Sequence, residues 1–160
     1  MFAAASSQLD ILSEILLALV FGGLIGLERE TQEKPAGLRT HMLAAASATL
    51  FIALGNYVVN EFDYPGFVRT DPIRIIQAII IGISFLGSGT IIQRDGGDYV
   101  QGLTTAASLL AAAGIGISVA LRQFVLAAGT TIIILIVNRV LGYLGSLIPN
   151  DSRPSQRTRN

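Results

Sequence analysis

The sequence contains no cysteine and no tryptophan, and it has a single histidine among its 160 residues. The lack of cysteine excludes disulfides, thiolate nucleophiles and cysteine-based zinc or iron–sulfur sites. One histidine cannot supply a histidine-rich metal site within one chain. The chain also lacks a Gly-Lys-Ser/Thr phosphate loop and a His-Glu-x-x-His pair. We therefore expect that the protein is not an enzyme and carries no resident cofactor. Mg²⁺ is the one candidate ligand that these absences do not exclude.

Charged residues are scarce as well. They make up 14% of the chain, against about 25% in ordinary soluble domains. The apolar residues reach 51%, and the formal net charge is zero. A nucleic-acid partner is not expected, because binding to phosphates needs a basic surface. The composition indicates a protein whose main partner is the lipid bilayer.

Long apolar segments set the predicted fold. A bilayer core about 30 Å thick requires about 20 apolar residues in a helix. Residues 9–27, 42–59, 73–92, 103–121 and 124–148 meet or nearly meet that length. The fold class is therefore all-α, an integral membrane helical bundle of five transmembrane helices in one domain over residues 1–148. The polar tail, residues 149–160, is expected to be disordered.

The distribution of basic residues predicts the orientation of the bundle, because cytoplasmic loops are enriched in Lys and Arg. Only Arg69, Arg74 and Arg122 lie on one side of the predicted membrane. We expect that side to be outside, with the N-terminus there and the C-terminus in the cytoplasm. No Lys or Arg occurs in the first ten residues, so we expect the first helix to be retained rather than cleaved. The opposite, cytoplasmic side holds the other eight basic residues: Arg29, Lys34, Arg39, Arg94, Arg139, Arg153, Arg157 and Arg159.

A short pattern occurs twice along the chain. The first helix ends in Gly-Gly-Leu-Ile-Gly-Leu, and Gly37-Leu38-Arg39-Thr40 leads into the second. The third ends in Ser-Phe-Leu-Gly-Ser-Gly, and Gly102-Leu103-Thr104-Thr105 leads into the fourth. Either the similarity is accidental, or the chain contains two parallel-repeated hairpins followed by a fifth helix.

Small residues recur at every fourth position, a spacing that lets helix backbones approach closely in lipid. Two interpretations are open for Gly22 and Gly26: packing within one subunit, or the face of a homodimer or higher homo-oligomer. The candidate helix-packing residues are Gly22, Gly26, Ser84, Gly87, Ser88 and Gly89.

The predicted third helix carries Arg74, Gln77, Ser84 and Ser88 at spacings that place them on one face. Because polar groups are costly against lipid, we expect this face to point into the bundle. It would either line an ion path or form hydrogen bonds between helices. Two further polar residues, Asn138 and Arg139, lie within the fifth helix. We expect Asn138 to donate across helices and Arg139 to reach the interface or a loop carboxylate.

The strongest candidate for a functional surface is the cytoplasmic loop after the first helix. Glu28, Arg29, Glu30, Arg39 and Thr40 lie there, and Thr104 and Thr105 begin the fourth helix on the same side. Helix N-termini offer free N–H groups and a partial positive charge. The free N–H groups at these two helix starts could be paired in three ways: by caps from Thr40 and Thr104, by the carboxylates of Glu28 or Glu30, or by a phosphate-bearing ligand. The alternative is a charged loop that only anchors the helix ends.

The predicted outer side carries acidic residues. Glu61, Asp63 and Asp71 share one loop, with Glu14 near it, and carboxylates are ligands that suit Mg²⁺. The simpler explanation is that outer loops are acidic because basic residues are biased inward, so the metal ligands stay unassigned. Asp71 followed by Pro72 is also typical of a helix start.

Three motifs in order resemble the MgtC/SapB family. They cover the first four predicted helices closely and the fifth loosely, and they differ from the family pattern at Ser84, Ser88 and Gln101, where Gly, Ala and Arg are frequent. The motifs are Gly22-Gly23-Leu24-Ile25-Gly26-Leu27-Glu28-Arg29-Glu30 with Lys34-Pro35-Ala36-Gly37-Leu38-Arg39-Thr40-His41-Met42-Leu43, then Asp71-Pro72-Ile73-Arg74 with Gly82-Ile83-Ser84-Phe85-Leu86-Gly87-Ser88-Gly89, and finally Gly102-Leu103-Thr104-Thr105-Ala106-Ala107.

The resemblance implies a bacterial inner-membrane protein linked to magnesium homeostasis and growth in low magnesium. It implies a regulatory protein that acts through another membrane complex, such as the F-type ATP synthase in one branch of the family. The alternative is a transporter or channel for Mg²⁺ or another ion, formed by an oligomer. Many members carry a soluble C-terminal domain after the fifth helix, and we expect this chain to lack it.

Overall fold

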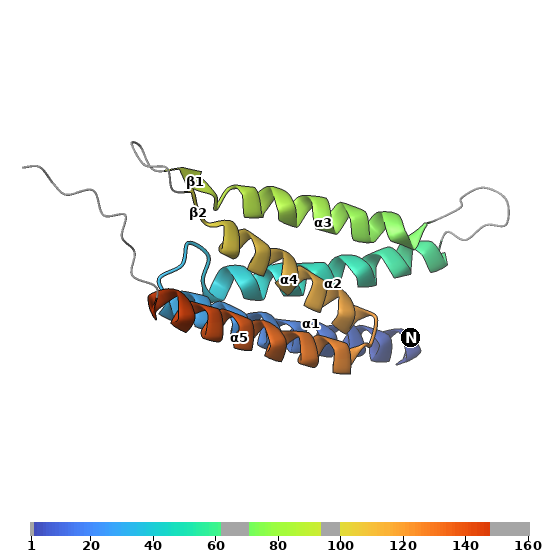
Figure 1. Ribbon diagram of the computed structural model, residues 1–160. Coiled ribbons are helices and arrows are strands. Elements are labelled where there is room, and N and C mark those ends of the chain that lie inside the picture. Colours follow the sequence, from blue (N-terminus) through green and yellow to red (C-terminus); the bar gives the residue numbers. More distant parts are fainter. Residues whose placement is uncertain (1, 62–70, 94–99, 148–160) are drawn as a thin grey trace, which may run out of the picture.

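The computed structural model describes residues 2–61, 71–93 and 100–147. These ranges form five helices and one pair of two-residue strands (Figure 1). The expected all-α bundle is confirmed, with a small antiparallel hairpin added between the third and fourth helices. In chain order the elements are α1 (Phe2–Thr31), α2 (Leu38–Glu61), α3 (Pro72–Ser88), β1 (Ile92–Gln93), β2 (Val100–Gln101), α4 (Leu103–Ala120) and α5 (Phe124–Leu147).

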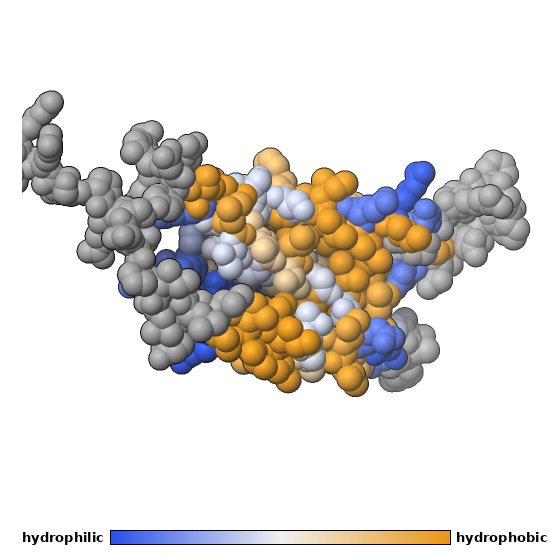
Figure 2. Space-filling view, viewed as in Figure 1, coloured by the Kyte–Doolittle hydropathy of each residue, from blue (hydrophilic) through white to orange (hydrophobic). Residues whose placement is uncertain are grey.

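The face of the bundle seen in Figure 2 is mostly apolar in its middle and hydrophilic at both ends. Large side chains such as Val125, Phe85 and Ile81 are 90%, 77% and 69% exposed, which is the arrangement that a bilayer requires. Three segments are long and apolar enough to cross a membrane: Ser7–Thr31, Leu38–Val59 and Leu103–Ala120. The apolar segments Ile73–Ser88 of α3 and Phe124–Val140 of α5 are shorter, within the described residues. The chain is a membrane protein.

Several helix boundaries differ from the sequence-based expectation: α1 begins at Phe2 rather than at residue 9, and α2 spans Leu38–Glu61 rather than residues 42–59. α1 continues through the charged residues 28–30 to Thr31, because hydrogen bonds and the ion pair between Glu28 and Arg29 support this turn. α3 ends at Ser88 rather than at residue 92. Its last turn is closed by the N–H of Gly89, which donates to the carbonyls of Phe85 and Gly87. The chain then turns into β1, so Ile92 pairs with Gln101 across the hairpin.

α4 lies at the centre of the bundle and contacts each of the other four helices. α1 packs along α2, and α1 and α3 run in the same direction (Figure 1). α3 is peripheral, since among the described residues its main contacts are with α4 and, less closely, with α2. The start of α1 and the end of α5 lie at opposite ends of the bundle, as an odd number of spanning helices requires.

Glycines allow the central helices to touch. A Cβ atom added at Gly22 would lie 2.5 Å from the carbonyl oxygen of His41, and one at Gly26 would lie 2.7 Å from the Cα of Leu38. Both glycines therefore face α2 of the same chain, so this face is already used and does not serve as a dimer surface. Gly87 faces α4 in a similar way, because a Cβ atom added there would lie 3.3 Å from the Cβ atom of Ala106.

The polar face of α3 does not point into the bundle, and that expectation was wrong. Arg74, Gln77, Ser84 and Ser88 are all exposed. The opposite face is buried instead, through Ile79, Ile83 and Gly87. Ser84 and Ser88 therefore make no close helix contact of the kind expected from their spacing. Ser88 donates its hydroxyl to the carbonyl of Phe85 in its own helix, at 2.7 Å.

Candidate functional site at the loop end of the bundle

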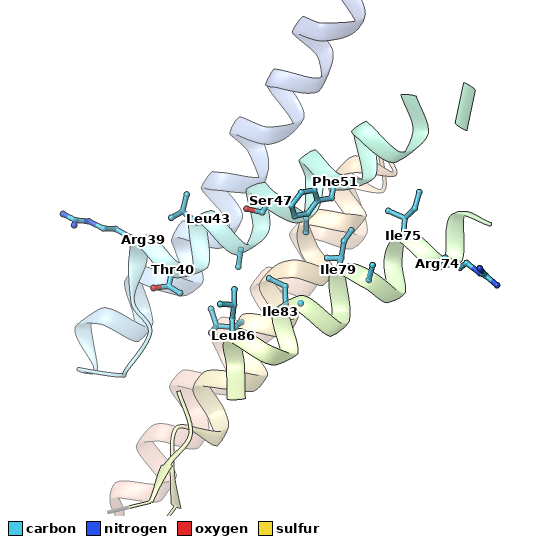
Figure 3. Close-up of a pocket in the computed structure, with 15 residues that line it drawn as sticks. Arg39, Thr40, Leu43, Ser47, Phe51, Arg74, Ile75, Ile79, Ile83 and Leu86 are labelled. Carbon is cyan, nitrogen blue, oxygen red and sulfur yellow. The ribbon is translucent and has the colours of Figure 1, made fainter. Parts of the chain in front are cut away.

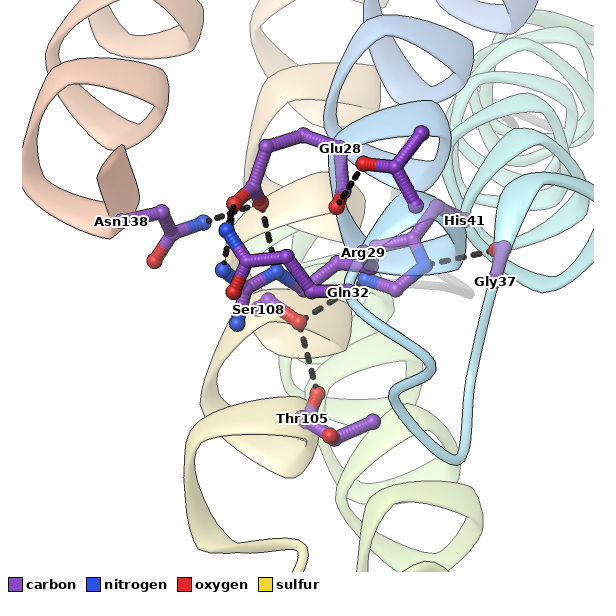
Figure 4. Close-up of polar contacts among 9 residues, drawn as sticks. Glu28, Arg29, Gln32, Gly37, His41, Thr105, Ser108 and Asn138 are labelled. Atoms are coloured by element: carbon purple, nitrogen blue, oxygen red, sulfur yellow. Dashed lines mark hydrogen bonds and ion pairs between the residues drawn. The ribbon is translucent and has the colours of Figure 1, made fainter. Parts of the chain in front are cut away.

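Buried polar side chains gather at the end of the bundle where α1 stops and α2 and α4 begin (Figure 4). The guanidinium of Arg29 donates to both carboxylate oxygens of Glu28, through Nε at 2.6 Å and Nη2 at 2.8 Å. The two side chains are only 3% and 10% exposed. A bidentate pair of this kind is strong and directional. Because the pair is buried, each charge depends on the other.

The Glu28 carboxylate also links α1 to α5. Its Oε2 atom accepts from the amide Nδ2 of Asn138 at 3.3 Å, and Oε1 accepts from the amide of Gln32 (Figure 4). Asn138 thus donates across helices, as its position predicted. Arg139 is exposed and lines a shallow cavity with Glu28 and Thr31, and no ion pair involves it among the described residues.

His41 joins α2 to α4 at the same end. The side chain is fully buried, with Nδ1 at 2.9 Å from the carbonyl oxygen of Gly37 and Nε2 at 2.8 Å from the hydroxyl of Ser108. The Ser108 hydroxyl also lies 2.9 Å from the carbonyl of Thr105. A neutral ring donates from Nδ1 and accepts from Ser108, whereas a doubly protonated ring donates to both partners while the hydroxyl turns to Thr105. The burial of the ring favours the neutral form, whose hydrogen bonds are complete.

We expect Ser108→Ala to destabilise the folded protein by about 1–3 kcal/mol, because it leaves the Nε2 atom of the buried ring without a partner. Ser118→Ala on the same helix is the matched control, since its hydroxyl bonds only to Gly114 one turn earlier. Thermal unfolding in detergent, followed by far-ultraviolet circular dichroism, measures both variants. Equal melting temperatures for the two variants would show that the contact between His41 and Ser108 contributes nothing.

Glu30 closes the N-terminus of α2. Its Oε2 atom accepts from the backbone N–H of Leu38 at 2.7 Å. A Glu30 carboxylate bound to the free N–H groups of this helix start was one of the alternatives predicted from the sequence. The proposed threonine caps were wrong, because both helices begin earlier. Thr40 lies within the first turn of α2, and the N-cap of α4 is Gly102, with a φ of 94° and no side-chain bond. That φ favours glycine.

The remaining candidates on this side differ in exposure. Arg39, Thr40 and Thr104 are exposed, whereas Thr105 is 1% exposed. The structure thus brings Glu28, Arg29 and Thr105 into one buried cluster and leaves Arg39 outside it. Two of its members, Ser108 and Asn138, lie far along the chain from the loop after α1, so the loop motif does not contain them.

At the opposite end, Glu14 is buried and accepts from Nε of Arg122 at 3.0 Å. Asp71 forms the predicted N-cap of α3, with Oδ1 accepting from the N–H of Ile73 at 3.0 Å. Among the described residues, no group of three His, Asp or Glu side chains could hold a metal ion. Asp63, Arg69, Arg94 and the tail from residue 149 lie outside the described residues, as does the side chain of Glu61.

Comparison with known proteins identifies one family. The chain matches the MgtC family over residues 15–147. It is 43% identical over 127 residues to protein MgtC of Salmonella typhimurium, covering 79% of this chain and 50% of that protein. It is 36% identical over 109 residues to protein SapB of Bacillus subtilis, covering 68% of this chain and 47% of that protein. No solved structure matches the chain.

A third relative extends the match to most of this chain. The putative magnesium transporter YhiD of Escherichia coli is 31% identical over 149 residues, which is 93% of this chain and 68% of that protein. The chain spans about half the length of MgtC and SapB, at 50% and 47%. The shared part therefore corresponds to the helical membrane region described above.

Proposed function

Because this chain belongs to the MgtC family, we propose that it is a regulatory protein of the bacterial inner membrane that acts by binding another membrane complex. The proposal includes a role in magnesium homeostasis or in adaptation to low magnesium, which the family resemblance implies. It also includes the orientation that the basic residues favour, with the N-terminus outside and the C-terminus in the cytoplasm. Each of these points is testable separately.

The observation that carries the proposal is the outward polar face of α3. Gln77 and Ser84 are exposed there, and neither side chain has a hydrogen-bond partner among the described residues. An unpaired amide in an apolar environment costs about 1–3 kcal/mol. A helix from another membrane protein that covers this face and bonds to these groups would recover that cost. We therefore assign the polar face of α3 as the surface that binds the partner.

The interior of the bundle supports binding over conduction. Small residues such as Gly22, Gly26 and Gly116 bring the helix backbones into direct contact, which leaves little room between α1, α2 and α4. Glu14, a buried carboxylate near the outer end, is engaged by Arg122. These contacts favour a rigid bundle that presents its surface to a partner.

A photo-cross-linking amino acid at position 84 tests the partner directly in living cells. We expect a cross-link to another membrane protein, with membrane subunits of the F-type ATP synthase as the partner that the family resemblance implies. Position 133 on α5, where Ile133 is 61% exposed, is the control for contacts with lipid and bystander proteins. The same products from both positions would overturn the proposal.

The strength of the contact is tested by Gln77→Leu in the background of the cross-linker at position 84. Polar contacts between membrane helices contribute about 0.6–2 kcal/mol, so we expect the cross-link yield to fall about three- to thirty-fold at limiting expression. Because Gln77 is exposed, the variant is expected to fold and insert normally. An unchanged yield would show that this amide takes no part in the interface.

A second function rests on the same polar face. The relative YhiD is named a putative magnesium transporter, and several copies of this chain could line an ion path with their α3 helices. In that case Gln77→Leu and Ser84→Leu lower ion flux rather than partner binding. The interior contacts described above make regulation the function that we favour.

A further inference from the structure

A groove runs between α2 and α3 on the outside of the bundle. It encloses about 870 Å³, and its walls are mostly apolar. Leu43 and Phe51 of α2 face Ile79 and Leu86 of α3 across it (Figure 3). The α2 wall belongs to a segment that is long and apolar enough to span the membrane, so the groove opens at the depth of lipid chains. An apolar occupant must fill it.

Cationic side chains stand at the two ends of this groove. Arg39 lies at the start of α2 and Arg74 at the start of α3, at opposite ends of the cavity (Figure 3). Both are exposed, and neither has an ion-pair partner among the described residues. The nearby carboxylate of Glu30 is bound to the N–H of Leu38, so it is already engaged. A guanidinium at the membrane surface attracts anionic headgroups.

We propose that the groove between α2 and α3 is a binding site for an anionic phospholipid of the cytoplasmic leaflet. The phosphate binds the guanidinium of Arg39 and the hydroxyl of Thr40, and an acyl chain lies along the apolar walls towards Phe51. Both polar residues line the same end of the cavity. The groove shares only Arg74 with the outward polar face of α3, and its headgroup contacts lie on α2, so the site does not depend on partner binding; the choice of leaflet rests on the orientation proposed above.

The size of the groove suits a lipid chain. The groove encloses about 870 Å³, which lies within the range of about 300–1,000 Å³ typical of small-molecule sites. The exposed cation at its cytoplasmic end matches a lipid phosphate.

The headgroup contact is tested by competition between two lipids. The full chain is purified in mild detergent and mixed with equal amounts of phosphatidylglycerol and phosphatidylcholine, and bound lipid is counted by native mass spectrometry. We expect the wild type to prefer phosphatidylglycerol. In Arg39→Gln the ratio of bound phosphatidylglycerol to bound phosphatidylcholine is expected to fall about five-fold, the effect of one basic residue beside an anionic lipid. Lys34→Gln is the control, since Lys34 is exposed on the same side but does not line the groove.

The acyl-chain contact is tested by filling the groove. Gly82 lines it, and a Cβ atom added there would meet nothing within 4 Å, so the side chain of Gly82→Leu starts in open space and is expected to fill part of the groove. Gly129→Leu is the matched control, because its Cβ would also meet nothing within 4 Å and it lies on α5. We expect Gly82→Leu to reduce bound lipid about ten-fold and Gly129→Leu to leave it unchanged.

Three results would overturn the site. Equal lipid retention by Gly82→Leu and Gly129→Leu would show that the acyl chain lies elsewhere. An equal preference for phosphatidylglycerol in Arg39→Gln and Lys34→Gln would remove the headgroup contact. A dimer mass that Gly82→Leu abolishes, with lipid unaffected, would identify a second copy of the chain as the occupant. If Gly82→Leu fails to fold, the comparison of Arg39→Gln with Lys34→Gln decides.

Discussion

Gly116→Ala is expected to destabilise the bundle by about 3 kcal/mol or more, at the upper end of the cost of overpacking a core. The added Cβ atom would lie 2.1 Å from the carbonyl oxygen of Ala45, so the backbones of α2 and α4 must separate. The separation also weakens the hydrogen bond in which the Thr49 hydroxyl donates to the carbonyl oxygen of Gly116 at 2.9 Å. α4 is the central helix, so the loss affects the whole fold.

The matched control lies two residues earlier on the same helix. A Cβ atom at Gly114 would meet nothing within 4 Å, so Gly114→Ala is expected to leave stability unchanged or to raise it by about 0.5–1 kcal/mol. Because the chain has no tryptophan, unfolding is followed by far-ultraviolet circular dichroism during thermal or detergent titration. Equal stability of the two variants would contradict the close approach of α2 and α4.

Glu28→Gln is expected to cost about 3–5 kcal/mol, because it leaves the buried guanidinium of Arg29 without a counter-charge. Arg29 is 2% exposed, so water cannot replace the lost carboxylate. The change also weakens the tie to Asn138, which joins α1 to α5. The same unfolding titration measures this effect, and we expect α5 to become more accessible to proteases.

Glu30→Gln is the control for Glu28→Gln. Glu30 is exposed and accepts a single backbone hydrogen bond, so its loss is expected to cost about 1 kcal/mol or less. The double variant Glu28→Gln/Arg29→Met is expected to recover most of the stability, since removing both buried charges is often neutral. If Glu28→Gln and Glu30→Gln unfold alike, the buried pair is not what holds this end together.

Hydropathy and small-residue spacing predicted the parts of the fold that depend on local sequence. The five apolar segments correspond to the five helices, because a bilayer imposes a helix length that can be read directly. Asp71 followed by Pro72 predicted the start of α3, since capping depends on neighbouring residues. The spacing of Gly22 and Gly26 indicated a close helix contact but not which helix it met.

The direction of the α3 polar face could not be predicted in the same way. The residues Gln77, Ser84 and Ser88 share one face, and Ile79, Ile83 and Gly87 share the opposite one. Either face can be buried in a membrane protein, because a partner can cover polar groups as well as the bundle can. The choice depends on how α3 meets α4, which is a property of the assembled bundle.

Contacts between residues far apart in the chain could not be predicted either, because no local sequence pattern indicates them. The bond between Asn138 and Glu28 spans 110 positions, and that between Arg122 and Glu14 spans 108. Ser108 is an ordinary small polar residue on an apolar helix, and only the fold places it against His41. The loop motif after α1 thus identified Glu28 and Arg29, whereas α4 and α5 supply Ser108 and Asn138.

The most direct test of the regulatory account is a measurement of Mg²⁺ flux in sealed liposomes that hold the purified protein. An internal indicator reports uptake under an imposed membrane potential, and a divalent-cation ionophore shows that the liposomes respond. The account predicts the same flux as in protein-free liposomes, both for the wild type and for Ser84→Leu. Flux well above that baseline, lowered by Gln77→Leu or Ser84→Leu, would identify a transporter and contradict the regulatory function.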